Sequence, residues 1–237
     1  MKILIVNDDG YKSPLLDILA KSALKYGEVT VFSPAKEQSA KSHAMHFWTG
    51  NIVKEVRGRS YKLFKVYGTP ADCTKVGLAL GEYDLVLSGI NNGLNIGNDI
   101  HYSGTCGAAC EAVLHGIKAI AFSAFWNNIE ETISGFEPVF NHVMDMLIDE
   151  EGLYFYNVNF PKDMKNIKGY RFTEMGNFID TAEAVKKGCR YFYKEHNFGY
   201  DLNNLNIDYS AVNAGFVSIT PLSVNFTDYK RLNNKAQ

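Results

Sequence analysis

The first ten residues constrain the fold of this chain most strongly. Residues 3–6 form an unbroken run of branched apolar side chains, and a polar turn from Asn7 to Gly10 follows directly. A short apolar run of this kind is typical of a strand buried on both faces, as in a parallel sheet. In open α/β sheets, ligands bind at the carboxyl ends of the strands, which is where this pattern puts Asp8 and Asp9.

The adjacent carboxylates of Asp8 and Asp9 have two interpretations. Adjacent carboxylates repel each other, so a partly buried pair needs a cation, and ligands that are all oxygen favour Mg²⁺, Mn²⁺ or Ca²⁺ over zinc. In the second interpretation the turn is solvated, and one Asp caps a helix that begins near Ser13. The residues of the turn alone leave both interpretations open.

Strand and helix patterns alternate along the sequence up to residue 160. A helical pattern over residues 15–24 ends at Gly27, a typical C-cap residue, and a strand over residues 28–32 follows. This order implies a right-handed crossover and a parallel sheet. Further strands are expected at residues 83–88, 118–123 and 154–160, helices from residues 70 and 104 and over 133–148, and a β-hairpin within 47–67. The chain is therefore predicted to be an α/β protein with three layers.

Two long polar loops carry candidate site residues. The loop from Pro34 to His46 leaves the second strand and contains Ser39, a candidate hydroxyl ligand, and His43, a candidate donor or proton-transfer group. Residues 89–105 are rich in Gly and Asn and end in Ser103-Gly104-Thr105, where a helical pattern begins. Unpaired N–H groups and the helix dipole favour an anion such as phosphate there. In the alternative interpretation, the two hydroxyl residues only cap the helix.

The sequence changes character after Pro161. Short β-like pieces at residues 169–173 and 190–193 alternate with polar stretches. We therefore divide the chain into a catalytic core, residues 1–160, and a β-rich C-terminal arm and oligomerisation region, residues 161–237, that packs on the core. A region too thin for a core of its own usually packs on the main domain or on a neighbouring subunit, so a dimer interface is expected here.

Composition and charge exclude several classes of protein. The 24 basic and 26 acidic residues give a net charge of -2, so neither a nucleic-acid polymer nor a membrane is expected as the main partner. The sequence shows no spanning apolar stretch and no leader pattern before the first strand, so a cytoplasmic location is predicted. The four cysteines are too few for a disulfide framework and are interpreted as free thiols.

A set of motifs in this sequence resembles those of a known family. The motifs occur in the family's order from residue 7 to residue 222, so the resemblance covers nearly the whole chain. They are Asn7-Asp8-Asp9-Gly10, Glu37-Gln38-Ser39 with His43, Gly68-Thr69-Pro70-Ala71-Asp72-Cys73, Ser88-Gly89-Ile90-Asn91, Asn95-Ile96-Gly97-Asn98-Asp99, Tyr102-Ser103-Gly104-Thr105 and Val217-Ser218-Ile219-Thr220-Pro221-Leu222. Together they resemble the SurE family, the stationary-phase survival proteins that are metal-dependent 5'-nucleotidases.

The resemblance implies a Rossmann-like α/β core with a phosphatase site that hydrolyses nucleoside 5'-monophosphates to nucleoside and phosphate. It implies one divalent cation per subunit, Mg²⁺ or Mn²⁺, and a C-terminal arm exchanged in a homodimer or homotetramer. By position, the implied metal ligands are Asp8, Asp9, Ser39 and Asn91, of which Asp8 and Asp9 are also the catalytic candidates. The implied phosphate-binding residues are Asn95, Ser103, Gly104 and Thr105, with His43 as a further candidate on the substrate side.

Some positions depart from the family pattern. Ala40 follows Ser39 where a glycine is common, Met45-His46-Phe47 stands where a small hydroxylated residue is usual, and Asn92 often has an arginine counterpart. None of these removes a candidate metal ligand, but the substrate side of the pocket is expected to differ.

Two other classes of protein compete with this interpretation. A non-catalytic nucleotide-binding or sensory domain would have the phosphate loop but would not need the metal-binding acids. A Rossmann oxidoreductase would need GxGxxG at the first turn, and the sequence contains neither that fingerprint nor a P-loop.

Overall fold

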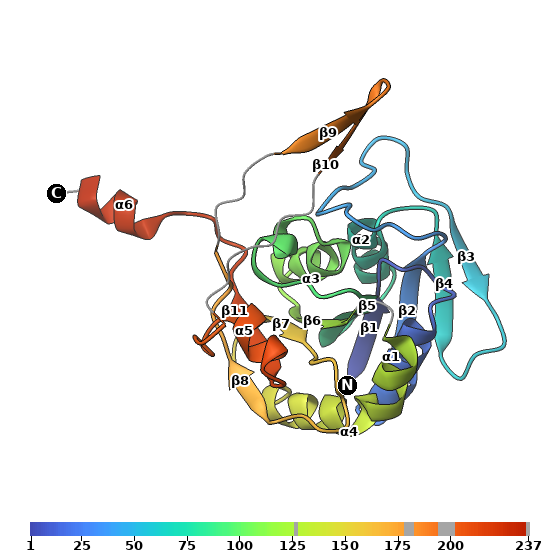
Figure 1. Cartoon of the computed structure of the whole chain (residues 1–237). Helices are drawn as coiled ribbons and strands as arrows, with labels where there is room; N and C mark the ends of the chain where they lie inside the picture. The colour runs from blue at the N-terminus through green and yellow to red at the C-terminus, as the bar shows by residue number, and fades with distance from the viewer. Residues whose placement is uncertain (126–127, 178–182, 194–201, 236–237) are drawn as a thin grey trace.

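The computed structural model describes residues 1–125, 128–177, 183–193 and 202–235. A nine-stranded sheet runs through the molecule in the order β3-β4-β2-β1-β5-β6-β7-β11-β8 (Figure 1). Its strands are β1 (Lys2–Val6), β2 (Glu28–Pro34), β3 (Val53–Val56), β4 (Lys62–Val66), β5 (Leu85–Asn92), β6 (Lys118–Ala124), β7 (Phe155–Asn159), β8 (Tyr170–Phe172) and β11 (Val217–Leu222). Six of them, from β4 to β7 in this order, are parallel to one another, which confirms the mostly parallel sheet.

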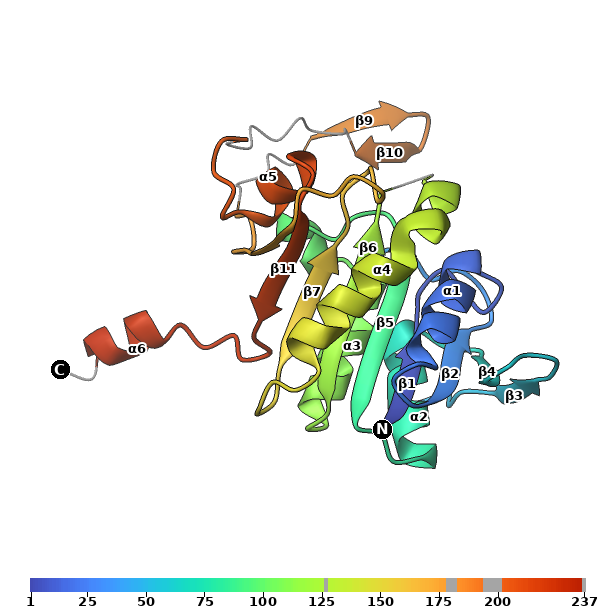
Figure 2. The same cartoon turned by 90° about the horizontal axis from the view of Figure 1, so that it is seen from below.

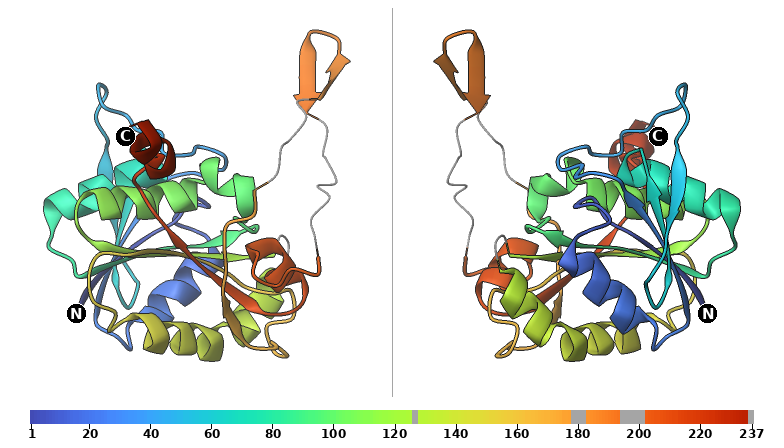
Figure 3. Two further views of the ribbon diagram at one scale, coloured as in Figure 1. Left: turned by 90° about the vertical axis from the view of Figure 1, so that its left-hand side faces the viewer. Right: turned by 90° about the vertical axis from the view of Figure 1, so that its right-hand side faces the viewer.

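Helices cover both faces of the sheet and make the three predicted layers (Figure 3). Helices α1 (Pro14–Ala23) and α4 (Ile129–Leu147) lie on one face, where Figure 2 shows them in front of the strands. Helices α2 (Pro70–Leu80) and α3 (Gly104–Leu114) lie side by side on the other face. None of the described helices is long and apolar enough to cross a membrane.

Strand β1 shows why an unbroken apolar run was needed at the centre of the sheet. Ile3 and Ile5 pack in the core on the α1 and α4 side, whereas Leu4 and Val6 pack in the core on the α2 and α3 side. All four side chains are fully buried. From Ile3 to Val6 the strand therefore presents an apolar residue to a covered face at every position.

Some element boundaries differ from the sequence prediction. Helix α1 ends at Ala23, so Gly27 is not its C-cap. A Cβ atom at Gly27 would lie 2.0 Å from the Met1 carbonyl oxygen, so glycine is required there by close backbone approach. Strand β5 continues to Asn92 through an irregularity between Ser88 and Asn91, beyond the predicted end at residue 88. The hairpin predicted within residues 47–67 is confirmed as the antiparallel pair β3 and β4.

The residues after 160 contribute to the central sheet as well as to an outlying part. Strand β11 pairs antiparallel with β7 and parallel with β8. Strands β9 (Ala184–Lys187) and β10 (Arg190–Tyr193) form a separate hairpin that stands away from the sheet (Figure 3). Helix α6 (Tyr229–Lys235) also lies away from the sheet, beyond β11 (Figure 2). Residues 178–182, 194–201 and 236–237 of the predicted arm lie outside the described residues, and the division at residue 160 stays a prediction.

Candidate functional site

The turn after β1 is fixed by its own first residue. The side-chain amide of Asn7 donates to the Gly10 carbonyl over 3.1 Å, and its oxygen accepts a 2.6 Å hydrogen bond from the Ser33 hydroxyl on β2. Asn7 is completely buried, so these bonds are well shielded from water. The two carboxylates that follow are thereby held at the carboxyl edge of the parallel strands, where the sequence predicted them. Asp8 is 3% exposed, and Asp9 is partly exposed.

Three further segments meet at Asp8 and Asp9. The loop after β2 contacts Asp8 through the backbone N–H of Gln38, which donates to the Asp8 carbonyl over 2.8 Å. The end of β5 contacts Asp9 through the N–H of Asn92, which donates to Oδ2 over 3.2 Å. The start of α3 contacts Asp8 through the Thr105 hydroxyl, which donates to Oδ1 over 2.7 Å. The loop that carries Ser39, the end of β5 with Asn91 and the start of α3 with Thr105 thus meet around the two acids.

The electrostatics of the two acids favour a bound cation. Burial raises the pKa of Asp8 despite the hydrogen bond from Thr105. Burial and the negative charge of Asp8 raise the pKa of Asp9 to about 7, with a smaller contribution from Glu37. Within the described part of the chain, neither acid forms a salt bridge with a lysine, arginine or histidine. The protein therefore keeps two adjacent carboxylates close together without a cationic side chain to balance them.

The donors around the acids fit a hard divalent cation. The Ser39 hydroxyl donates to Glu37 Oε1 over 2.7 Å, which leaves its lone pairs available as ligands. The Asn91 amide nitrogen donates to the Gly93 carbonyl over 2.7 Å, so its oxygen is the atom that can act as a ligand. Among the described residues there is no group of three or more His, Cys, Asp or Glu side chains that could hold a metal ion. Two carboxylates, a hydroxyl and an amide oxygen are a ligand set for Mg²⁺ or Mn²⁺.

The start of α3 is closely packed against Asp8. The Ser103 hydroxyl accepts a 3.0 Å hydrogen bond from the Cys106 N–H and is the N-cap of the helix. A Cβ atom at Gly104 would lie 3.1 Å from Asp8 Cβ and 3.0 Å from Pro70 Cγ, so a side chain there would displace its neighbours. The hydroxyls of Ser103 and Thr105 therefore each have a partner within the protein, and the carboxylate of Asp8 lies at the positive end of the helix.

Two of the predicted substrate residues have other partners. Asn95 is buried, and its side-chain amide donates to the Ser123 hydroxyl over 2.8 Å. His43 Nε2 lies 2.7 Å from Glu111 Oε2 on the second half of α3. Hydrogen bonds to Cys110 and Glu111 raise the pKa of His43 to about 9. Of the predicted site residues outside the turn, Thr105 contacts Asp8 directly, whereas Ser39 and Asn91 are each next in sequence to a residue whose backbone N–H bonds to one of the two acids. The side chains of Asn95 and His43 are held elsewhere.

Comparison with known proteins agrees with the resemblance. A model of the family described as "Survival protein SurE" matches residues 3–181, which include every predicted site residue. The chain belongs to the SurE family. A SurE relative from Campylobacter lari, named 5'-nucleotidase SurE, is 37% identical over 98% of this chain and 96% of that protein. Another from Thermoanaerobacter sp., with the same name, is 36% identical over 98% of this chain and 96% of its own length.

A solved SurE structure has the same fold. The crystal structure of the SurE protein from Aquifex aeolicus superimposes with a TM-score of 0.80 at 33% sequence identity. The match covers 99% of this chain and 98% of that one, so the central sheet and the C-terminal strands both belong to the shared architecture.

Two buried acids that hold this SurE site together were missed from the sequence. Glu111 is 4% exposed and binds His43. Glu111 is the only charged residue among the small and mostly apolar residues from Gly104 to Leu114, and it could have been noticed for that reason. Asp208 is completely buried and accepts hydrogen bonds from the N–H groups of Gly97, at 2.8 Å, and Gly176, at 3.0 Å. It ties the glycine and asparagine loop to the C-terminal region, and no local pattern indicates this.

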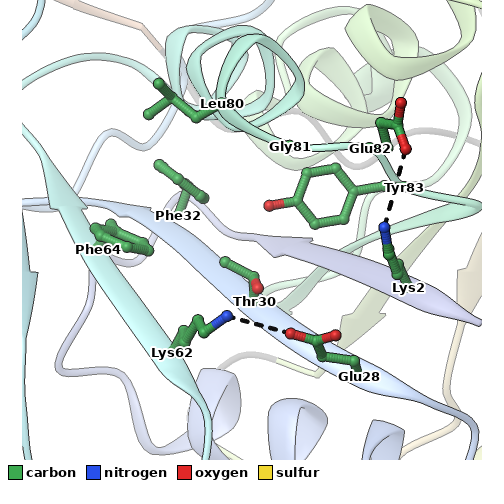
Figure 4. A pocket seen from close by; sticks show the side chains of 10 residues that line it. All are labelled: Lys2, Glu28, Thr30, Phe32, Lys62, Phe64, Leu80, Gly81, Glu82 and Tyr83. Carbon is green, nitrogen blue, oxygen red and sulfur yellow. Dashed lines mark hydrogen bonds and ion pairs between the residues drawn. The ribbon is translucent and has the colours of Figure 1, made fainter.

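A surface groove at the other end of the sheet is separate from this SurE site. It is lined by Lys2, Glu28 and Lys62, which lie at the start of β1, β2 and β4, and by residues that follow α2 (Figure 4). Ion pairs join Lys62 to Glu28 at 3.2 Å and Lys2 to Glu82 at 3.9 Å. The groove is thus at the amino ends of the parallel strands, whereas Asp8 and Asp9 follow a carboxyl end.

Proposed function

We propose that this chain is a divalent-metal-dependent phosphatase that hydrolyses nucleoside 5'-monophosphates to nucleoside and phosphate. The observation that carries the proposal is the pair Asp8 and Asp9, which is enclosed by three loops and has no described cationic partner. Relatives that align over nearly the whole chain are named 5'-nucleotidase SurE, which supports the choice of substrate.

The metal is proposed to be Mg²⁺ or Mn²⁺, one ion per subunit, held by Asp8, Asp9, Ser39 and Asn91. When bound, such an ion supplies a Lewis acid that polarises a phosphoryl oxygen and helps to activate water. The Thr105 hydroxyl contributes by fixing one oxygen of Asp8, so that the carboxylate cannot rotate away. The backbone N–H of Asn92 has the same effect on Asp9.

The phosphoryl group is proposed to lie at the start of α3, beside the two acids. Backbone N–H groups at a helix N-terminus attract phosphate oxygens and stabilise charge that develops on them. Both hydroxyls have partners in the protein. The N–H of Ser103 also donates to the Ile100 carbonyl over 3.4 Å, and the N–H of Thr105 bonds to Asp8, so of the three backbone donors the Gly104 N–H is the one proposed to bind phosphate without such an exchange. Of the two acids, Asp9 is the candidate to accept a proton from the attacking water, because it is the more exposed.

Direct phosphate contacts by Asn95 and His43 would require their present hydrogen bonds to be given up. The amide of Asn95 would have to leave Ser123, and the ring of His43 would have to leave Glu111. Leaving a buried polar group without its partner costs about 1–3 kcal/mol. For these two residues a role in supporting the loops is better supported than a contact with substrate.

An apolar cavity between α3 and residues of β7 and β11 is a candidate for the nucleoside part of the substrate. It shares Ser103 with the proposed phosphate segment, and its walls include Ile100, Phe155 and Leu222. Ligand sites commonly combine apolar walls of this kind with a few polar groups that fix orientation.

Homodimer or homotetramer formation through the C-terminal region is part of the proposal. Tyr191, Phe192 and Tyr193 on β10 are all exposed, and an isolated two-stranded hairpin is at best marginally stable in water. Phe226 and Leu232 are likewise exposed on the segment beyond β11. A cytoplasmic location is also proposed, because the four free cysteines fit a reducing compartment.

A panel of phosphate monoesters, assayed with Mg²⁺, Mn²⁺ or EDTA, tests this function. We expect phosphate release from nucleoside 5'-monophosphates with either metal and none with EDTA. Tight nucleotide binding without phosphate release under all these conditions would instead identify a non-catalytic nucleotide-binding or sensory domain. Turnover that is unaffected by EDTA would contradict the metal-dependent function.

A further inference from the structure

The loop that carries Ser39 has little regular structure of its own. Between the end of β2 at Pro34 and the start of β3 at Val53 the chain forms neither helix nor strand. Ala40 and Ser42 have φ values of 56° and 55°, a left-handed conformation that residues other than glycine rarely adopt. Such conformations persist where the surroundings fix them. Something outside the loop must therefore hold it in place.

The first contact that holds the loop is on α3. His43 Nε2 lies 2.7 Å from Glu111 Oε2, and Glu111 is 4% exposed. The backbone of the loop also touches the helix directly, because a Cβ atom at Gly107 would lie only 2.3 Å from the Ser42 carbonyl oxygen. The N–H of Ser42 donates to the Tyr102 carbonyl just before the helix begins.

Glu111 is ionised in this arrangement. Burial alone would raise the pKa of Glu111, but its hydrogen bonds to His43, Lys75 and His115 hold that pKa below the usual value. Lys75 and His115 both approach its other oxygen, Oε1, at 3.2 and 3.0 Å. Oxygen Oε2 is the one that meets the loop.

The second contact is on α2 and has the same chemistry. His46 Nδ1 lies 2.7 Å from Asp72 Oδ2, the His46 N–H donates to Oδ1 over 3.0 Å, and Asp72 is 2% exposed. The Thr69 hydroxyl at the start of α2 donates to the Ala44 carbonyl over 2.6 Å. Asp72 also caps α2, since its Oδ2 accepts a 2.9 Å hydrogen bond from the Thr69 N–H, so this acid has two uses.

The two contacts have a common arrangement. In each, a histidine of the loop binds a nearly buried carboxylate that is fixed on a helix. The same pair of helices borders the acids, since Thr105 of α3 binds Asp8 and Pro70 of α2 packs at Gly104 beside it. Because α2 and α3 contact both the loop and the surroundings of Asp8, they fix the position of the loop relative to the two acids.

We propose that Glu111 and Asp72 are positioning residues, which act through His43 and His46 to place Ser39 at the proposed metal centre. This inference rests on the proposed function, because it assigns the loop a place in that centre. Neither acid touches metal or substrate in this arrangement. Partners that orient a ligand from outside the coordination sphere typically change metal affinity by about 10- to 100-fold when mutated.

The experiment compares binding of Mn²⁺ to the wild type, Glu111→Gln and the matched control His115→Gln. His115 shares the Glu111 carboxylate but does not touch the loop. Calorimetric titration with Mn²⁺ gives the affinity, and hydrolysis of a nucleoside 5'-monophosphate gives kcat at saturating Mn²⁺. We expect Glu111→Gln to weaken Mn²⁺ binding about tenfold or more, with kcat at saturating metal much less affected. The control should bind Mn²⁺ as the wild type does.

His46→Ala provides a second variant in case Glu111→Gln does not fold. Its ring is 47% exposed, and the substitution leaves Asp72 free to cap α2. Weaker Mn²⁺ binding in this variant supports the inference in the same way. Unchanged Mn²⁺ affinity in a folded Glu111→Gln or His46→Ala protein, even with a lowered melting temperature, would overturn it and leave the proposed function standing. Absence of Mn²⁺ binding in the wild type would overturn the proposed function itself, and this inference with it.

Discussion

Replacing Asp9 by asparagine should make the metal-free protein more stable and at the same time remove its response to metal. The pKa of Asp9 is raised from 3.8 to about 7 in the folded protein. The folded state therefore holds a proton that the unfolded state releases, and stability falls as the pH rises from about 4 to about 7. At 1.36 kcal/mol per pKa unit, the cost of the charge above pH 7 is about 4 kcal/mol.

The substitution should recover most, but not all, of this cost. The hydrogen bond from the Asn92 N–H to Asp9 Oδ2 becomes a bond to a neutral amide, which is weaker by about 1 kcal/mol. A net gain of about 2–3 kcal/mol above pH 7 corresponds to a melting temperature higher by roughly 5–10 °C in a chain of this size. The gain should largely disappear near pH 4, which is close to the pKa of 3.8 of Asp9 in the unfolded chain, because little of the cost of ionising Asp9 remains there.

The assay is thermal unfolding of the wild type and Asp9→Asn from pH 4 to pH 8, with EDTA and with Mn²⁺. Asp149→Asn, which removes an exposed carboxylate from the end of the molecule beyond α4, is the matched control. Mn²⁺ should raise the melting temperature of the wild type and the control far more than that of Asp9→Asn. An Asp9→Asn protein that is less stable than the wild type at pH 8 in EDTA would refute the reasoning that the pair is held against its own repulsion.

The remaining predictions concern the support of the site and the C-terminal region. Thr105→Ala should destabilise the protein by about 1.5–3 kcal/mol, because the buried Asp8 carboxylate loses a hydrogen bond, and Thr105→Ser should restore it; equal melting temperatures for all three proteins would contradict this. Because the folded-state pKa of His43 is raised from 6.5 to about 9, its bond to Glu111 stabilises fully below pH 6.5 and the effect is lost as the pH rises through 9. Unfolding of the wild type and His43→Gln should therefore converge between those pH values, and a constant difference would be inconsistent with the assignment. Replacing the hairpin Ala184–Tyr193 by a short Gly-Ser linker should lower the mass measured by light scattering, and an unchanged mass would exclude the hairpin from the oligomer interface.

The place of the two acids could be predicted because it follows from one strand. Ile3, Leu4, Ile5 and Val6 alternate between two covered faces, and only a central strand needs apolar residues at every position. The end of such a strand fixes where the next polar residues lie. The alternation of strand and helix patterns along the sequence likewise predicts the parallel sheet and the helices on both of its faces.

The partners of the site residues could not be predicted, because they depend on how distant loops meet. Thr105 lies 97 residues from Asp8 in the sequence, and nothing local decides whether its hydroxyl caps α3 or binds that carboxylate. Asp72 fits a helix cap so well that its bond to His46 has no separate signal. Asn95 stands in a loop typical of ligand binding, yet its amide lies in a buried network with Ser123.

The C-terminal strands show the same limit for the fold. The residues from Val217 to Leu222 suit a strand, but β-propensity does not say which partner a strand finds. Strand β11 enters the central sheet between β7 and β8, whereas β9 and β10 pair only with each other among the described strands. Sheet membership is decided by packing against α5 (Asp208–Asn213) and the neighbouring strands, which composition does not reveal.

Phosphate release from a nucleoside 5'-monophosphate by Asp8→Asn at saturating Mn²⁺ shows whether Asp8 is a metal ligand needed for hydrolysis. Asp8 is the proposed ligand that the protein buries most deeply, and asparagine retains its shape and can still accept the hydrogen bond from Thr105. We expect a folded protein whose turnover is lower than that of the wild type by at least about 100-fold, a larger loss than removal of a residue that only orients a metal ligand would cause. A folded Asp8→Asn protein with near-normal turnover would contradict the assignment of the metal centre to this pair of acids.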